Sequence, residues 1–92
     1  MDKSALGFIE LPNLTCAINA LDTMLKSAVI TFETWEKRLG GRLVTIIISG
    51  SVASVTAAVD TAKTSYDIRA AHVIPAPHPE TVKMVQASKR GL

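Results

Sequence analysis

Few side chains in this 92-residue chain are spaced for covalent or metal chemistry. The single cysteine, Cys16, falls inside a predicted helix, and no G-x-S-x-G or similar motif surrounds any serine. His72 and His78 have no third His, Cys or Asp beside them to complete a metal site, and the acidic residues are scattered without an obvious pair. We therefore expect no enzyme activity, no metal and no cofactor, and we interpret Cys16 as a buried structural thiol.

The most concentrated charge is at residues 37–42, Lys-Arg-Leu-Gly-Gly-Arg, where three cations surround two glycines. On a single chain this segment is the solvated tip of a hairpin. Around a symmetry axis, copies of it would form a ring of positive charge with exposed backbone N–H groups, which is suited to passing anions. These residues alone leave both interpretations open.

The elements before this turn are a strand and a helix. Residues 5–9 are apolar and are followed by Pro12, which cannot continue a strand ladder. Asn13 is placed to cap a helix that runs to residue 26 or 27. Its apolar residues recur at steps of four, three and four, which predicts that this face packs in the core: Leu14, Ile18, Leu21 and Leu25.

Residues 29–36 and 43–49 are rich in β-branched side chains and flank the glycines, which predicts a hairpin. Simple alternation along the first of these strands places Val29 and Trp35 on the face opposite Ile30 and Phe32. Both faces of the sheet would then be partly apolar. A monomer of this size rarely exposes so much apolar surface, so we expect an oligomer.

A second helix follows Ser51, and residues 68–74 form a strand that ends at Pro75. Pro79 begins a short tail helix over about residues 79–90. The predicted fold is α/β, an α+β sandwich with a four-stranded antiparallel sheet of βαββαβ order. Right-handed crossovers place the two main helices on one face of the sheet.

Length and composition predict one domain over residues 1–92, with its core in about residues 5–78. The net charge of +2 and the absence of aromatic residues from the strand at 43–49 argue against nucleic-acid binding. No signal-peptide pattern begins the chain, and its longest apolar run is too short for a membrane helix. We expect a cytoplasmic protein that contacts neither nucleic acid nor membrane.

Four sequence blocks, in order, resemble the bacterial microcompartment domain in its single-domain, hexamer-forming shell-protein type. The blocks are Ala-Leu-Gly-Phe-Ile-Glu at 5–10, Asp-Thr-Met-Leu-Lys-Ser-Ala at 22–28, Glu-Lys at 36–37 with Leu-Val-Thr at 43–45, and His-Val-Ile-Pro-Ala-Pro-His at 72–78. The resemblance covers about residues 5–78.

The resemblance implies a flat homohexamer that tiles with other microcompartment shell proteins around encapsulated enzymes in the cytoplasm. It also implies a central pore that passes small metabolites. The implied pore-lining residues are Arg38, Leu39, Gly40, Gly41 and Arg42. The implied hexamer-edge contacts are Lys26, Pro75, Ala76, Pro77 and His78.

Two departures from the family pattern affect these expectations. Ala76 stands where the family usually has an arginine, which would weaken tiling or make it depend on a partner. The turn has one inserted residue and Gly in place of the usual Ser. Its arginines predict a pore selective for anions such as carboxylates or phosphorylated metabolites, unless Leu39 turns inward and closes it.

Two other functions stay open at this point. One is a small-molecule-sensing regulatory domain with the same element order, acting as a dimer with its ligand between subunits. The other is a nucleic-acid-binding domain, which would depend on residues 37–42 and the basic pair Lys89 and Arg90.

Overall fold

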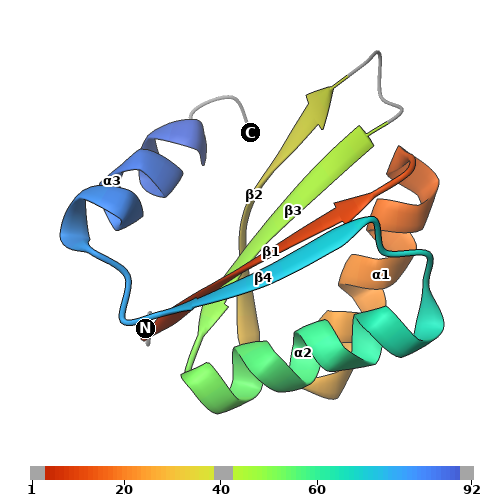
Figure 1. The fold of residues 1–92 in the computed structure, drawn as a ribbon, viewed down its shortest axis with the longest axis horizontal. Coiled ribbons are helices and arrows are strands. Elements are labelled where there is room, and N and C mark those ends of the chain that lie inside the picture. Colours follow the sequence, from red (N-terminus) through yellow and green to blue (C-terminus); the bar gives the residue numbers. More distant parts are fainter. Residues whose placement is uncertain (1–3, 39–42, 90–92) are drawn as a thin grey trace.

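A computed structural model of the chain describes residues 4–38 and 43–89. The described elements alternate in the predicted order and end in a tail helix (Figure 1). They are β1 (Ala5–Leu11), α1 (Leu14–Ser27), β2 (Ile30–Arg38), β3 (Leu43–Gly50), α2 (Val52–Ser65), β4 (Ala70–Pro75) and α3 (Pro79–Ser88). The βαββαβ order of the sequence prediction is confirmed.

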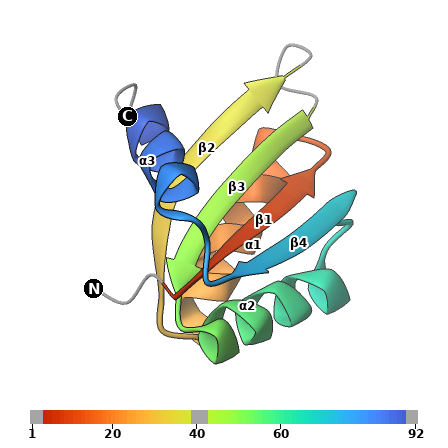
Figure 2. The same cartoon turned by 60° about the vertical axis from the view of Figure 1, so that its left-hand side comes forward.

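The four strands form one antiparallel sheet in the order β2-β3-β1-β4. The hairpin strands β2 and β3 are neighbours, as predicted, and β2 and β4 are the two edge strands (Figure 2). At one end of the sheet, Ala5 pairs with both Gly50 and Pro75, and Gly50 pairs with Ile30. At the other end Arg38 pairs with Leu43.

Both main helices begin at the predicted caps and cover the same face of the sheet. The Asn13 side chain accepts a hydrogen bond from the backbone N–H of Cys16, and the Ser51 side chain accepts one from Ser54. α2 packs tightly against β1 at Gly7, where an added Cβ would lie 2.8 Å from Val55 Cγ1. Close packing at this point therefore requires the glycine.

The face that α1 turns toward the core differs from the predicted one. Its fully buried residues are Ala17, Ala20 and Met24. Ile18 is instead 57% exposed and Leu25 44% exposed, while Leu14 and Leu21 are half-buried at the margin of the core. Small alanine side chains let the helix lie close to the sheet and α2, so the larger apolar residues lie along its flank.

The simple alternation predicted for β2 is also wrong. Phe32 pairs with Ile48 and Thr34 pairs with Ile47, so Glu33 is an extra residue in a β-bulge. The bulge shifts the alternation by one position. Trp35 therefore lies on the same face as Phe32, beside α1, and not on the opposite face.

α3 lies on the opposite face of the sheet from α1 and α2 (Figures 1 and 2). Its one buried residue, Val85, packs against Leu6 and Ile47, with Phe8 at the side. The helix starts at Pro79 as predicted and ends at Ser88, slightly before the expected end. α3 thus covers part of the face that a βαββαβ sheet leaves open.

Candidate pore loop and assembly surfaces

The predicted pore-lining residues lie at the joined ends of β2 and β3. Leu39, Gly40, Gly41 and Arg42 lie outside the described residues, as does the side chain of Arg38, whose backbone ends β2. The last described side chain of β2 is that of Lys37, whose Nζ lies 5.1 Å from the centre of the Trp35 ring. This cation–π contact holds one positive charge at the base of the loop.

The predicted edge residues lie at the opposite end of the sheet. Pro75 and Gly50 both pair with Ala5, so they lie at the same end of the sheet. Gly50 is seven residues from Leu43, which begins β3 at the other end. This spacing separates the two ends by about 24 Å along β3. Lys26 is in the last turn of α1, just before the chain enters β2 at Ile30. The structure thus brings the two predicted edge segments to one end of the sheet, whereas Arg38 and Leu43, which flank the predicted pore loop, pair at the other end (Figure 1).

Lys26 is exposed and forms an ion pair with Asp22 one turn earlier, with 2.8 Å between Nζ and Oδ2. The hydrogen bond to Asp22, followed by its negative charge, raises the pKa of Lys26 above 10.5. Both side chains of the pair are exposed, so it is a weak surface ion pair on the last turns of α1.

Residues 75–78 form the turn between β4 and α3. Ala76 has a φ of 47°, and its N–H donates a 2.7 Å hydrogen bond to the carbonyl oxygen of Ser4. His78 caps α3, because its Nδ1 accepts a 3.0 Å hydrogen bond from the N–H of Glu80. This cap is a local role for His78 within its own chain.

An apolar groove of about 310 Å³ runs between α1 and edge strand β2. Its lining residues are Leu14, Ile18, Leu21, Phe32, Trp35 and Ile46. The apolar stripe of α1 is evident in the sequence, but the prediction that it packs in the core is wrong for Ile18, which is 57% exposed. α1 carries more large apolar residues than its small core-facing side can bury. This excess was the available signal for an open groove.

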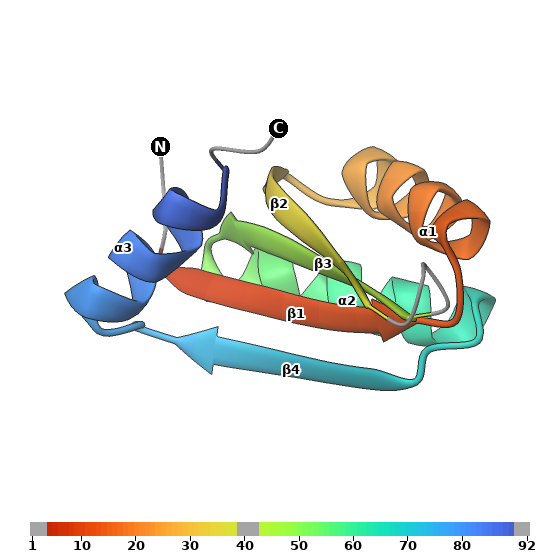
Figure 3. The same cartoon turned by 90° about the horizontal axis from the view of Figure 1, so that it is seen from above.

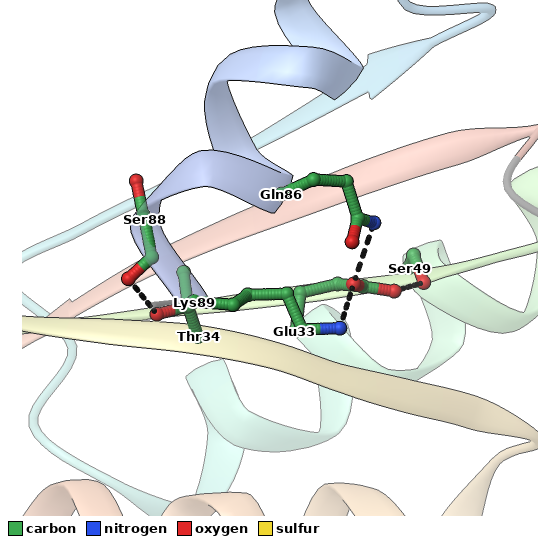
Figure 4. A network of polar contacts seen from close by, with 6 residues as sticks. All are labelled: Glu33, Thr34, Ser49, Gln86, Ser88 and Lys89. Carbon is green, nitrogen blue, oxygen red and sulfur yellow. Dashed lines mark hydrogen bonds and ion pairs between the residues drawn. The ribbon is translucent and has the colours of Figure 1, made fainter. Parts of the chain in front are cut away.

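A buried carboxylate on β2 was missed by the sequence analysis. Glu33 is 1% exposed and accepts hydrogen bonds from the Ser49 hydroxyl and from Gln86 Nε2, the latter at 3.2 Å (Figure 4). Lys89 Nζ lies 3.1 Å from the same carboxylate. An acidic residue inside an apolar strand was the available signal, because a buried charge needs partners.

In the part of the chain that the structure describes, no helix is long and apolar enough to span a membrane. The same residues hold no group of three or more His, Cys, Asp or Glu side chains placed to bind a metal ion. Cys16 is half-buried rather than fully buried, and His72 is exposed on β4.

Comparison with known proteins places these features in a family. The family model for the BMC domain matches residues 5–77. The chain is 42% identical to the bacterial microcompartment shell protein PduA of Citrobacter freundii over 89 residues, covering 92% of this chain and 95% of the relative. It is 34% identical over 91 residues to the shell protein EutM of Escherichia coli K12, covering 95% of this chain and 93% of the relative.

A crystal structure of a microcompartment protein from Desulfitobacterium hafniense has the same fold, with a TM-score of 0.79 and 26% identity. The match covers 91% of this chain and 47% of that protein, so this chain spans about half of its length. The named relatives are structural shell proteins and not enzymes, in agreement with the sequence analysis. The chain belongs to the BMC domain family and is a shell protein of a bacterial microcompartment.

Proposed function

We propose that this chain acts as one BMC domain, assembles into a cyclic homohexamer and tiles with other shell proteins into microcompartment facets. The observation that carries the proposal is the open apolar groove between α1 and β2, with Ile18 57% exposed on it. An apolar surface of this kind on so small a domain favours burial by a partner. In a homo-oligomer the partner is a second copy.

The directions of the elements support a ring rather than an open chain or a face-to-face pair. The pore loop and the predicted edge residues occupy opposite ends of the sheet, which leaves two flanks to meet neighbouring subunits. One flank is β2 with α1, and the other is β4 with α2. These flanks differ, so their contact is heterologous, and repeating it closes a ring if the rotation between subunits fits.

In this ring, the loops converge on the axis and form a basic pore. Arg38, Leu39, Gly40, Gly41 and Arg42 are then the pore-lining residues, with Lys37 just behind them. Six copies concentrate positive charge and backbone N–H groups at one opening, which favours anionic metabolites over cations. The pore would serve the enzymes enclosed by the shell.

The outer edge of the ring carries Lys26 and residues 75–78. The Lys26 side chain is exposed on the last turn of α1, where its ammonium can exchange Asp22 for the turn of an adjacent hexamer. Ala76 supplies no long donor there, so edge contacts depend more on Lys26, Pro75, Pro77 and His78. We therefore expect mixed tiling with other shell proteins to be stronger than tiling of this chain alone.

Replacement of Ile18 by Asp tests the groove. A carboxylate in the subunit contact would cost desolvation, so this variant should sediment as a folded monomer. Met84→Asp is the matched control, because Met84 is an apolar residue that is 67% exposed on α3, which belongs to neither flank. The proposal fails if Ile18→Asp assembles like the unmodified chain, or if both substitutions abolish assembly equally.

A further inference from the structure

The connection between β4 and α3 is strained in the observed arrangement. Ala76 has a φ of 47°, a left-handed conformation that is unfavourable for residues with a Cβ. Ala76 also precedes Pro77, and a following proline favours an extended backbone. The local sequence therefore favours a straight connection, whereas the structure bends it to fold α3 back over its own sheet (Figure 3).

The surface that receives α3 is small and specific. Val85 enters an apolar site formed by Leu6 and Ile47. Beside it, the Glu33 carboxylate contacts Gln86 and Lys89 (Figure 4). The surface thus binds a specific pattern along α3. The pattern is an apolar residue (Val85), an amide at the next position (Gln86) and a cation four positions after the apolar residue (Lys89).

A second copy of the chain offers this same pattern. If α3 of one copy docks on the sheet of another, Val85, Gln86 and Lys89 find the same partners as before. The contacts of α3 are therefore the same in the closed form, where the helix lies on its own chain, and in the exchanged form, where it lies on another copy. They favour neither form. The conformation of the hinge and the protein concentration decide between them.

We propose that two copies of this chain exchange α3, with residues 76–78 acting as the hinge. In the exchanged form the hinge is extended, which relieves the left-handed conformation of Ala76. The exchange requires only two copies and no ring. In the tiling proposed above, the hinge lies at the hexamer edge, so exchange would join neighbouring hexamers, and this last step alone rests on the proposed function.

Cysteine pairs distinguish exchange from self-docking. In a Cys16→Ser background, one chain carries Ile47→Cys and another carries Val85→Cys, and the two are refolded together under oxidising conditions. Residues 47 and 85 share one buried cluster, so exchange should produce a covalent heterodimer. Met84→Cys replaces Val85→Cys in the matched control, because Met84 is 67% exposed and points away from the site.

A heterodimer that forms with Val85→Cys and not with Met84→Cys supports exchange. If a chain with both Ile47→Cys and Val85→Cys closes internally while the mixture yields no heterodimer, exchange is overturned. Ala76→Gly, which removes the penalty of the left-handed hinge, should lower the heterodimer yield at least about fivefold. An unchanged yield would contradict the role of the hinge.

A charge-reversal pair gives a readout that does not depend on cysteine geometry. Glu33→Lys and Lys89→Glu each place like charges together within a closed chain. Exchange between the two variants brings opposite charges together at both docking sites. The mixture should melt at a higher temperature than either variant alone, and a mixture that melts as two separate variants would overturn exchange. The native mass of the unmodified chain tests the hexamer separately.

Discussion

Replacing Lys89 by Met is expected to loosen α3 while leaving the sheet and the other two helices intact. The helix is held on the sheet by a single buried side chain, Val85, and by polar contacts to Glu33 and Thr34. The Lys89→Met substitution keeps most of the unbranched side chain and removes one cation from the buried Glu33 carboxylate. Hydrogen bonds from Ser49 and Gln86 remain.

The size of the effect follows from the exposure of Lys89. Hydrogen bonds to charged groups contribute ~1.5–3 kcal/mol, and the 34% exposure of the Lys89 side chain places this contact at the lower end. Burial of Val85 contributes about 1.5–3 kcal/mol to the same docking. A loss of ~1.4 kcal/mol multiplies the population of undocked α3 about tenfold.

Amide hydrogen exchange measures this population one segment at a time. Amides of α3, such as that of Val85, should exchange about tenfold faster in Lys89→Met, while those of β3 keep their rates. Lys83→Met is the control, because Lys83 is exposed on α3 and its contact to Glu80 is 3.8 Å long. An unchanged exchange rate of the α3 amides, or an equal acceleration of the β3 amides, would mean that Lys89 does not hold α3 on the sheet.

Three further predictions concern the core, the edge and the pore. Gly7→Ala should lower the free energy of unfolding by about 1–3 kcal/mol, because its Cβ would press on α2, and an unchanged denaturation midpoint would contradict the packing. Since the pKa of Lys26 is raised, the stability from its pair with Asp22 is complete below the ordinary lysine pKa and is lost as pH rises through the raised one. An NMR titration should show the Lys26 pKa falling in Asp22→Asn, and the same titration curve in both proteins would count against the pair. Arg38→Ser and Arg42→Ser should reduce anion preference in bilayer conductance measurements, and unchanged selectivity in both variants would rule out a basic pore.

The order of the elements could be predicted because local signals mark their ends. Asn13 and Ser51 have the side chains that cap helices, and both do so. Pro75 and Pro79 end a strand and begin a helix for reasons that depend on the backbone alone. These signals need no knowledge of the rest of the fold.

The orientation of two elements could not be predicted, because it depends on tertiary packing. A β-bulge at Glu33 reverses the alternation of β2, and the Glu33 carboxylate at this bulge contacts Ser49 and Gln86 of α3. Likewise, α1 has two apolar faces. Close packing selects the small one with Ala17 and Ala20, and this choice leaves Ile18 outside.

The candidate site was predictable in part for the same reason. The four sequence blocks mark the family, and the register of the sheet places Pro75 at the end opposite the paired residues Arg38 and Leu43. The Glu33 network could not be assembled from sequence, because Gln86 and Lys89 reach it only through the path of α3.

The proposed assembly is a ring in which six copies of this chain close around their basic loops. Native mass spectrometry of the unmodified chain, over a range of concentrations, measures the number of copies. We expect a dominant species of six times the 9.8 kDa chain mass. A monomer or dimer at all concentrations would contradict it, because the loop would then be an isolated hairpin tip and no pore would form.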